Sequence, residues 1–141
     1  DVVGGRMSTD PDDYQKLVKE LSNGHSIKYW GDATDNTKIG LMQSAKALIY
    51  PVAQLEIHSH KAVEAMMCGC PVITYNIGAL NEVVGLGGLV VNTEDEFIKA
   101  MQEVQYFPRD EVRKWALKWD RTNIVGDYVK LMEEVAGGKR W

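Results

Sequence analysis

The sequence predicts an α/β domain with a doubly wound, Rossmann-like parallel sheet and helices on both faces. Short apolar segments alternate with longer segments whose apolar residues recur at helical spacing. Residues 47–50 and 71–75 are apolar almost throughout, which is typical of strands buried on both faces. Right-handed crossovers between parallel strands then lay the intervening helices across the sheet. The 141 residues, 45% hydrophobic and 26% charged, have the composition of an ordinary globular domain.

Five short segments are expected to be strands. They are residues 2–3, 27–30, 47–50, 71–75 and 89–91. The first ends at Gly4 and Gly5, a pair that is more often a simple turn than a phosphate-binding loop. We expect residues 1–136 to form one domain and residues 137–141 to be a tail.

Two helices are expected in the first third of the chain. One carries its apolar face at i, i+3, i+4 and i+7, on Tyr14, Leu17, Val18 and Leu21. A second, shorter helix is expected to be capped by Asp35 or Thr37 and to turn Ile39 and Met42 inward.

Four further helical segments follow the third strand. The first spans about residues 60–67 and ends at Gly69. Thr93 and Glu96 form a capping box for the next, whose expected buried face is Phe97, Ala100, Met101 and Val104. Two amphipathic stretches close the chain, with apolar residues at Val112, Trp115 and Trp119, then at Ile124, Tyr128, Leu131 and Val135. Helical spacing indicates that Trp115, Trp119 and Tyr128 pack in the core or between domains, rather than stack on a bound sugar.

Charge and cysteine content exclude several classes. Lys plus Arg 16 against Asp plus Glu 20 gives a net charge of −4, so nucleic acid is not an expected partner. No apolar run approaches the roughly 20 residues of a membrane span, and no signal-peptide pattern is present. Cys68 and Cys70 are too close for an ordinary disulfide, which favours a reducing, cytoplasmic setting. His58-x-His60 and Cys68-x-Cys70 fit no standard zinc spacing, so no metal is expected.

The candidate site lies where the strands of such a sheet end. Glu56 precedes the helix at residues 60–67, and Glu64 lies about a turn inside it. The free amides near Ser59 and His60, at the positive end of the helix dipole, can bind an anion. Carboxylates on either side of a phosphate site suit a nucleotide sugar, whose hydroxyl-bearing rings flank a diphosphate.

These residues resemble the retaining nucleotide-sugar glycosyltransferases of family 4, which have the GT-B fold of two Rossmann-like domains. The Glu-x7-Glu pair of Glu56 and Glu64 carries the resemblance. It continues through Gly69, Pro71-Val72-Ile73, Gly78, Glu82-Val83-Val84 and Leu89-Val90-Val91, and upstream through Trp30-Gly31 and 47–51. The chain departs from the family pattern at Val52, His58 and Ser59, where the family usually has serine, phenylalanine and glycine.

The resemblance implies a role for each matching position. Glu56 would contact the donor sugar near the reacting carbon, and Glu64 would bind the ribose hydroxyls. The remaining implied contacts are the backbone of His58, Ser59 and His60 for diphosphate or sugar, Gly31 and Asp32 for the base, and Gly78, Ala79 and Leu80 for sugar and phosphates. The donor would be the substrate, with no metal and no other cofactor.

The resemblance also implies a larger enzyme. The chain is expected to begin one βα unit after the start of the family's donor domain, and to work with an amino-terminal acceptor domain through which any membrane contact would come. Two alternatives use the same scaffold. One is a non-catalytic binding module, and the other is a GT-B sugar-nucleotide epimerase, because a fold does not fix a function.

Overall fold

The computed structural model describes residues 20–22 and 26–140. It divides into two compact units, residues 1–41 and 42–141, and each is described by itself. The expected strand at 2–3, its turn at Gly4 and Gly5, and most of the helix that carries Tyr14 lie outside the described residues. Glu20 and Leu21, at the end of that helix, are helical.

The first unit differs in detail from the expectation. The expected strand at 27–30 is reduced to a single bridge residue, Tyr29. Helix α2 (Asp35–Ser44) is capped by Thr34, whose Oγ1 accepts from the Thr37 amide at 3.3 Å, and not by Asp35 or Thr37. The side chain of Ile39 is 41% exposed rather than inward. Met42 is partly buried and packs against the core cluster that contains Met66, as expected.

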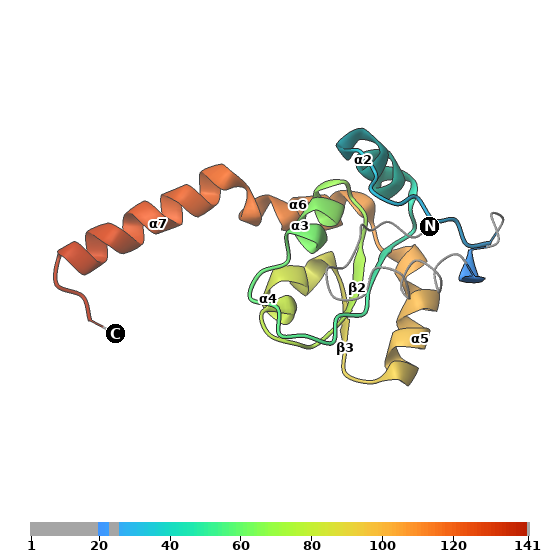
Figure 1. Cartoon of the computed structure of the whole chain (residues 1–141). Helices are drawn as coiled ribbons and strands as arrows, with labels where there is room; N and C mark the ends of the chain where they lie inside the picture. Colours follow the sequence, from blue (N-terminus) through green and yellow to red (C-terminus); the bar gives the residue numbers. More distant parts are fainter. Residues whose placement is uncertain (1–19, 23–25, 141) are drawn as a thin grey trace. The chain divides into compact units, whose positions relative to one another are not determined.

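The second unit contains a parallel three-stranded sheet in the order β1-β2-β3. The strands are β1 (Leu48–Tyr50), β2 (Val72–Tyr75) and β3 (Gly88–Val91). Leu48 pairs with Val72, and Val72 with Gly88, so the three strands run side by side in one direction. Figure 1 labels two of them, β2 and β3. These are the third, fourth and fifth expected strands, and the α/β fold class is confirmed.

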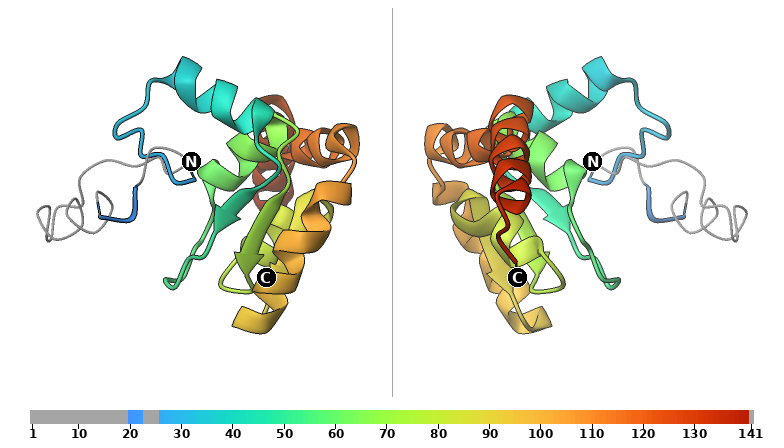
Figure 2. Two further views of the ribbon diagram at one scale, coloured as in Figure 1. Left: turned by 90° about the vertical axis from the view of Figure 1, so that its right-hand side faces the viewer. Right: turned by 90° about the vertical axis from the view of Figure 1, so that its left-hand side faces the viewer.

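Helices cover both faces of this sheet. In chain order the helical elements are α3 (His60–Met67), α4 (Leu80–Val84), the 3-10 turn η1 (Gly85–Gly87), α5 (Glu94–Glu103), η2 (Val104–Tyr106), α6 (Arg109–Ala116), η3 (Leu117–Trp119) and α7 (Arg121–Ala136). Val72 packs with Met66 of α3 in one core cluster, whereas Ile73 packs with Phe97 of α5 in the other. Adjacent residues of β2 therefore face opposite layers, and Figure 2 shows α3 and α5 on the two sides of the strands.

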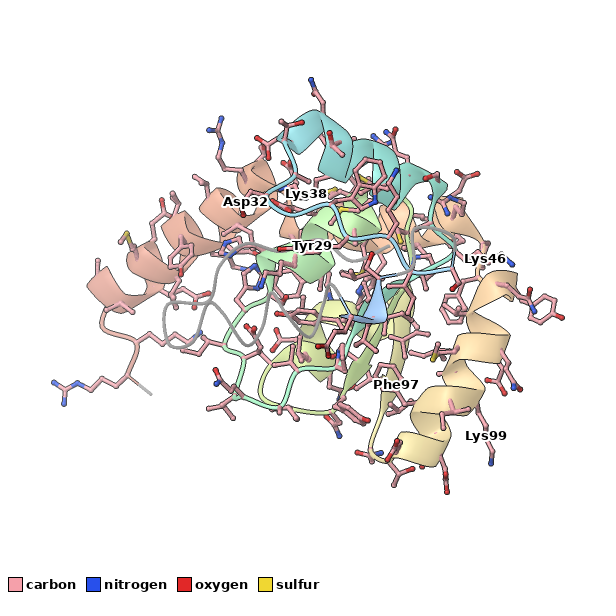
Figure 3. The ribbon with its side chains drawn as sticks, turned by 45° about the vertical axis from the view of Figure 1, so that its right-hand side comes forward. Tyr29, Asp32, Lys38, Lys46, Phe97 and Lys99 are labelled. Carbon is pink, nitrogen blue, oxygen red and sulfur yellow. The ribbon has the colours of Figure 1, made fainter. Side chains whose placement is uncertain are left out.

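The capping box of α5 is confirmed, but its buried face is narrower than expected. Thr93 Oγ1 accepts from the Glu96 amide at 3.3 Å, and Glu96 Oε2 accepts from the Asn92 amide at 2.7 Å. Phe97 and Ala100 are buried, whereas Met101 is 51% exposed because it lies at the edge of the stripe that faces the sheet. Figure 3 shows Phe97 on the side of α5 that faces the strands and Lys99 on the outer side.

The two expected carboxy-terminal helices behave differently. Trp115 and Trp119 pack against the core as expected, and both indole N–H groups donate to the Val83 carbonyl, at 3.2 and 3.1 Å. Helix α7 has no buried residue, and Tyr128 is 61% exposed. No described part of this unit therefore covers the apolar face expected on α7. Within the described ranges, no helix is long and apolar enough to cross a bilayer.

Candidate functional site

The candidate site gathers three segments of the second unit at the carboxyl ends of β1 and β2. They are the loop 51–59 after β1, the start of α3, and the turn 76–79 after β2. Tyr50, the last residue of β1, is paired in register with Thr74 of β2. Loops that follow neighbouring parallel strands leave the sheet at the same edge, and this edge is where such sheets bind ligands.

Glu56 is fixed at both its side chain and its backbone. The Tyr50 hydroxyl donates to Glu56 Oε1 at 2.7 Å. The Glu56 carbonyl accepts from the Ala79 amide at 2.8 Å. Glu56 as a whole is half-buried.

The turn after β2 approaches the backbone of Glu56 closely. Gly78 has φ +61°, and a β-carbon there would lie 2.1 Å from the Glu56 carbonyl oxygen. Only glycine fits both the left-handed backbone and this distance. The structure thus brings together Glu56, Gly78 and Ala79, which the sequence had placed in one site from motif alone. Leu80 follows at the start of α4 with its side chain fully buried in the protein.

Ser59 caps helix α3 in place of the glycine typical of the resembled family. Its Oγ accepts from the Ala62 amide at 3.3 Å, its carbonyl accepts from the Val63 amide at 3.2 Å, and the residue is buried. Among the residues that the structure describes, the amides of His60 and Lys61 have no acceptor. The first turn of α3 therefore presents unpaired N–H groups at the positive end of the helix dipole.

The two histidines extend the site toward the carboxy-terminal helices. The rings of His58 and His60 lie 5.1 Å apart between centroids in an edge arrangement. The His58 ring also lies 5.3 Å from the ring of Trp119 in η3. His58 is half-buried and His60 is exposed. The loop that carries Glu56 is consequently in contact with the segment that leads into α7.

The other predicted site residues, Glu64, Gly31 and Asp32, lie outside the three segments that form the candidate site around Glu56. Glu64 is an exposed residue of α3, one turn inside the helix from the free amides. Gly31 and Asp32, expected at the base pocket, belong to the first unit. Gly31 has φ +60° and Asp32 is exposed.

Tyr50 is a site residue that the sequence did not single out. Burial raises its pKa, the hydrogen bond with Ser59 opposes that rise, and the hydrogen bond and charge of Glu56 add to it. The phenol is therefore protonated at neutral pH and donates to the Glu56 carboxylate. The available signal was a tyrosine at the end of an apolar strand, directly before the loop that carries Glu56.

The cysteines and histidines form no metal centre in the described part of the chain. No group of three or more His, Cys, Asp or Glu side chains there is arranged to hold an ion. Cys70 is buried, and burial raises the pKa of its thiol to about 11, with Arg109 opposing the rise. Cys70 is thus a core residue whose thiol is protonated at neutral pH.

The sequence is similar to known glycosyltransferases. Residues 1–105 match the model of a family described as glycosyl transferases group 1. The chain is 32% identical over 94 residues to O-antigen chain mannosyltransferase B of Escherichia coli, covering 67% of this chain and 24% of that protein. It is 28% identical over 93 residues to D-inositol 3-phosphate glycosyltransferase 1 of Catenulispora acidiphila, covering 64% of this chain and 22% of that protein.

A solved structure shares the fold. AviGT4, a glycosyltransferase involved in avilamycin A biosynthesis, superimposes with a TM-score of 0.72 at 22% identity. The match covers 99% of this chain and 44% of AviGT4. The chain therefore spans about a quarter of the curated relatives and less than half of the solved one.

Proposed function

The chain belongs to the group 1 glycosyl transferases, and we propose that it is the donor-binding part of an enzyme that transfers a sugar from a nucleoside diphosphate sugar with retention of configuration. The observation that carries this proposal is the placement of Glu56. Its carboxylate is fixed by Tyr50 and its backbone by Ala79, in the loop that leads into the open first turn of α3. A positioned carboxylate can bind the sugar hydroxyls of such a donor, and the adjacent anion site can bind its diphosphate.

Each part of the site has a distinct role in this proposal. The amides of His60 and Lys61 bind the diphosphate and stabilise the negative charge that develops on it as the bond to the sugar breaks. Glu56 accepts hydrogen bonds from the sugar hydroxyls and orients the reacting carbon. Glu64 binds the ribose hydroxyls and so determines nucleotide affinity. No metal is needed in this scheme, because the helix amides stabilise the leaving group.

We propose that the acceptor binds to another part of the same enzyme. This chain covers 24% of the similar mannosyltransferase, so the complete relatives contain much that is not represented here. The donor sugar would be presented at Glu56, toward an acceptor held by an amino-terminal domain. We place the reaction in the cytoplasm, where nucleoside diphosphate sugars and reduced cysteines are both expected.

Calorimetric titration of the full-length protein with UDP, GDP and ADP tests donor binding. One nucleotide should bind saturably, and Glu64→Ala should weaken its binding about tenfold, as expected for lost hydrogen bonds to a charged group. Glu103→Ala, an exposed glutamate at the end of α5, is the matched control and should bind as the unaltered protein does. Equal affinity in Glu64→Ala and Glu103→Ala would contradict the assignment of Glu64.

Product analysis tests the reaction. With a donor sugar of the preferred nucleotide, we expect a glycoside of unchanged anomeric configuration, and Glu56→Ala should lower turnover while the nucleotide diphosphate still binds. Release of an epimerised sugar without transfer would identify an epimerase instead. Binding without any turnover in the presence of acceptor extracts would favour a non-catalytic module.

A further inference from the structure

Tyr50 packs against the core and directs its hydroxyl to the Glu56 carboxylate. It is the terminal residue of β1, and it packs against the core cluster built around α3 and α6. From there the hydroxyl donates to Glu56 Oε1 at 2.7 Å. Because the ring is held by a rigid strand and a packed core, the position of the hydroxyl is determined by the fold rather than by the loop.

The loop itself gives Glu56 little other support. Within the described residues, the Glu56 carboxylate is hydrogen-bonded only to Tyr50, whereas the Ala79 amide donates to its backbone carbonyl. A glutamate has three side-chain torsions, so a fixed backbone alone leaves the carboxylate several orientations. The hydrogen bond from Tyr50 selects one of them.

We propose that Tyr50 is a positioning residue for sugar transfer, which holds the Glu56 carboxylate in the orientation that meets the donor sugar. This inference rests on the proposed function of Glu56. The phenol remains protonated through the neutral pH range, since burial and Glu56 both raise its pKa, so the hydrogen bond persists wherever the enzyme is active. Ser59, whose hydroxyl caps α3, acts in the opposite direction and lowers the pKa of Tyr50.

Steady-state kinetics of the full-length protein test this role. Tyr50→Phe keeps the ring and removes the hydroxyl, and should lower kcat roughly 10- to 100-fold, as small displacements of a reacting group do. The KM for donor should stay within about twofold, because nucleotide affinity rests on Glu64 and the α3 amides. The matched control is Tyr75→Phe on β2, since Tyr75 packs on Phe97 and its hydroxyl has no partner in the described part of the chain.

A double-mutant cycle separates positioning from a structural role. If Tyr50 acts through Glu56, Tyr50→Phe should have little further effect on kcat in the Glu56→Ala background. An equal loss of kcat in both backgrounds overturns the inference, as does a Tyr50→Phe enzyme with the kcat of the Tyr75→Phe control.

A measurement without turnover distinguishes failure of this inference from failure of the proposed function. Tyrosine labelled at Cζ with ¹³C reports phenol ionisation, and the signal lost in Tyr50→Phe assigns Tyr50. Its titration midpoint should fall in Glu56→Ala, because the acceptor and the negative charge are removed. An unchanged midpoint overturns the inference. A shifted midpoint together with full sugar transfer by Glu56→Ala would instead refute the proposed role of Glu56. The hydrogen bond from Tyr50 would then exist but would not contribute to sugar transfer.

Discussion

A β-carbon on Gly78 would lie 2.1 Å from the carbonyl oxygen of Glu56, so the turn after β2 and the loop after β1 touch at a point with no space for a side chain. The neighbouring Ala79 amide donates to that same carbonyl at 2.8 Å. Two segments separated by more than twenty residues in the sequence are thus joined through backbone atoms. The position of Glu56 depends on this junction as much as on its own loop.

Gly78→Ala should therefore damage both stability and sugar transfer. The substitution forces a β-carbon into a left-handed residue and against the Glu56 backbone, and we expect a loss of about 1–3 kcal/mol in the free energy of unfolding. Urea denaturation measures this loss. Gly126→Ala in α7 is the control, because nothing lies within 4 Å of its added β-carbon and alanine favours a helix by up to about 1 kcal/mol. Equal changes in the free energy of unfolding for Gly78→Ala and Gly126→Ala would refute the close contact between Gly78 and Glu56.

The sheet could be predicted from the sequence because its strands are apolar on both faces. Residues 48–50, 72–75 and 88–91 match the expected segments within a residue or two. Met101 was assigned to a buried face wrongly, because helical spacing identifies a stripe but not whether a partner covers it. The strand at 27–30 is not formed beyond Tyr29, since pairing depends on neighbours as well as on composition.

The candidate site was predictable only in part. The spacing of Glu56 and Glu64 around a helix start could be seen in the sequence, and Ser59 does cap that helix. The contact of Gly78 with Glu56 depends on where two loops meet after the strands pair in register, which no local pattern encodes. The hydrogen bond from Tyr50 depends on side-chain torsions in the packed protein.

Arg109 joins the ends of two helices to the start of α6, and Arg109→Met should destabilise the protein. Its guanidinium donates to the carbonyls of Gln43 and Ala45, both at 2.7 Å, and of Cys68 at 3.3 Å. Carbonyls at helix ends have no partner within the helix, so removal of this donor leaves several unsatisfied at once. We expect a loss of about 2–4 kcal/mol in the free energy of unfolding. Arg113→Met, an exposed residue of the same helix, should change it by less than about 0.5 kcal/mol.

Trp115 and Trp119 share one acceptor, so their substitutions should not be additive. Both indoles donate to the Val83 carbonyl, and Val83 is buried. Trp115→Phe or Trp119→Phe alone leaves the other donor in place, whereas the double substitution removes both. The double variant should lose about 1 kcal/mol more than the sum of the single losses, as an unsatisfied buried carbonyl does. Denaturant unfolding of the four proteins gives this coupling, and strict additivity would contradict it.

Cys70 should make the protein less stable at alkaline pH. Burial raises its pKa from 9.0 to about 11, so between these values the unfolded chain loses the thiol proton while the folded protein retains it. Deprotonation then favours the unfolded state, and the free energy of unfolding contributed by this group falls as pH rises from about 9 to about 11.

Cys70→Ala should be less stable than the parent at pH 8, because it loses buried side-chain atoms. Its free energy of unfolding should nevertheless fall less steeply above pH 9. Urea titrations at pH 8, 9.5 and 11 measure the slope, with Cys68→Ala as the control that keeps the steep decline. A parallel decline in Cys70→Ala and the parent would show that another group causes it.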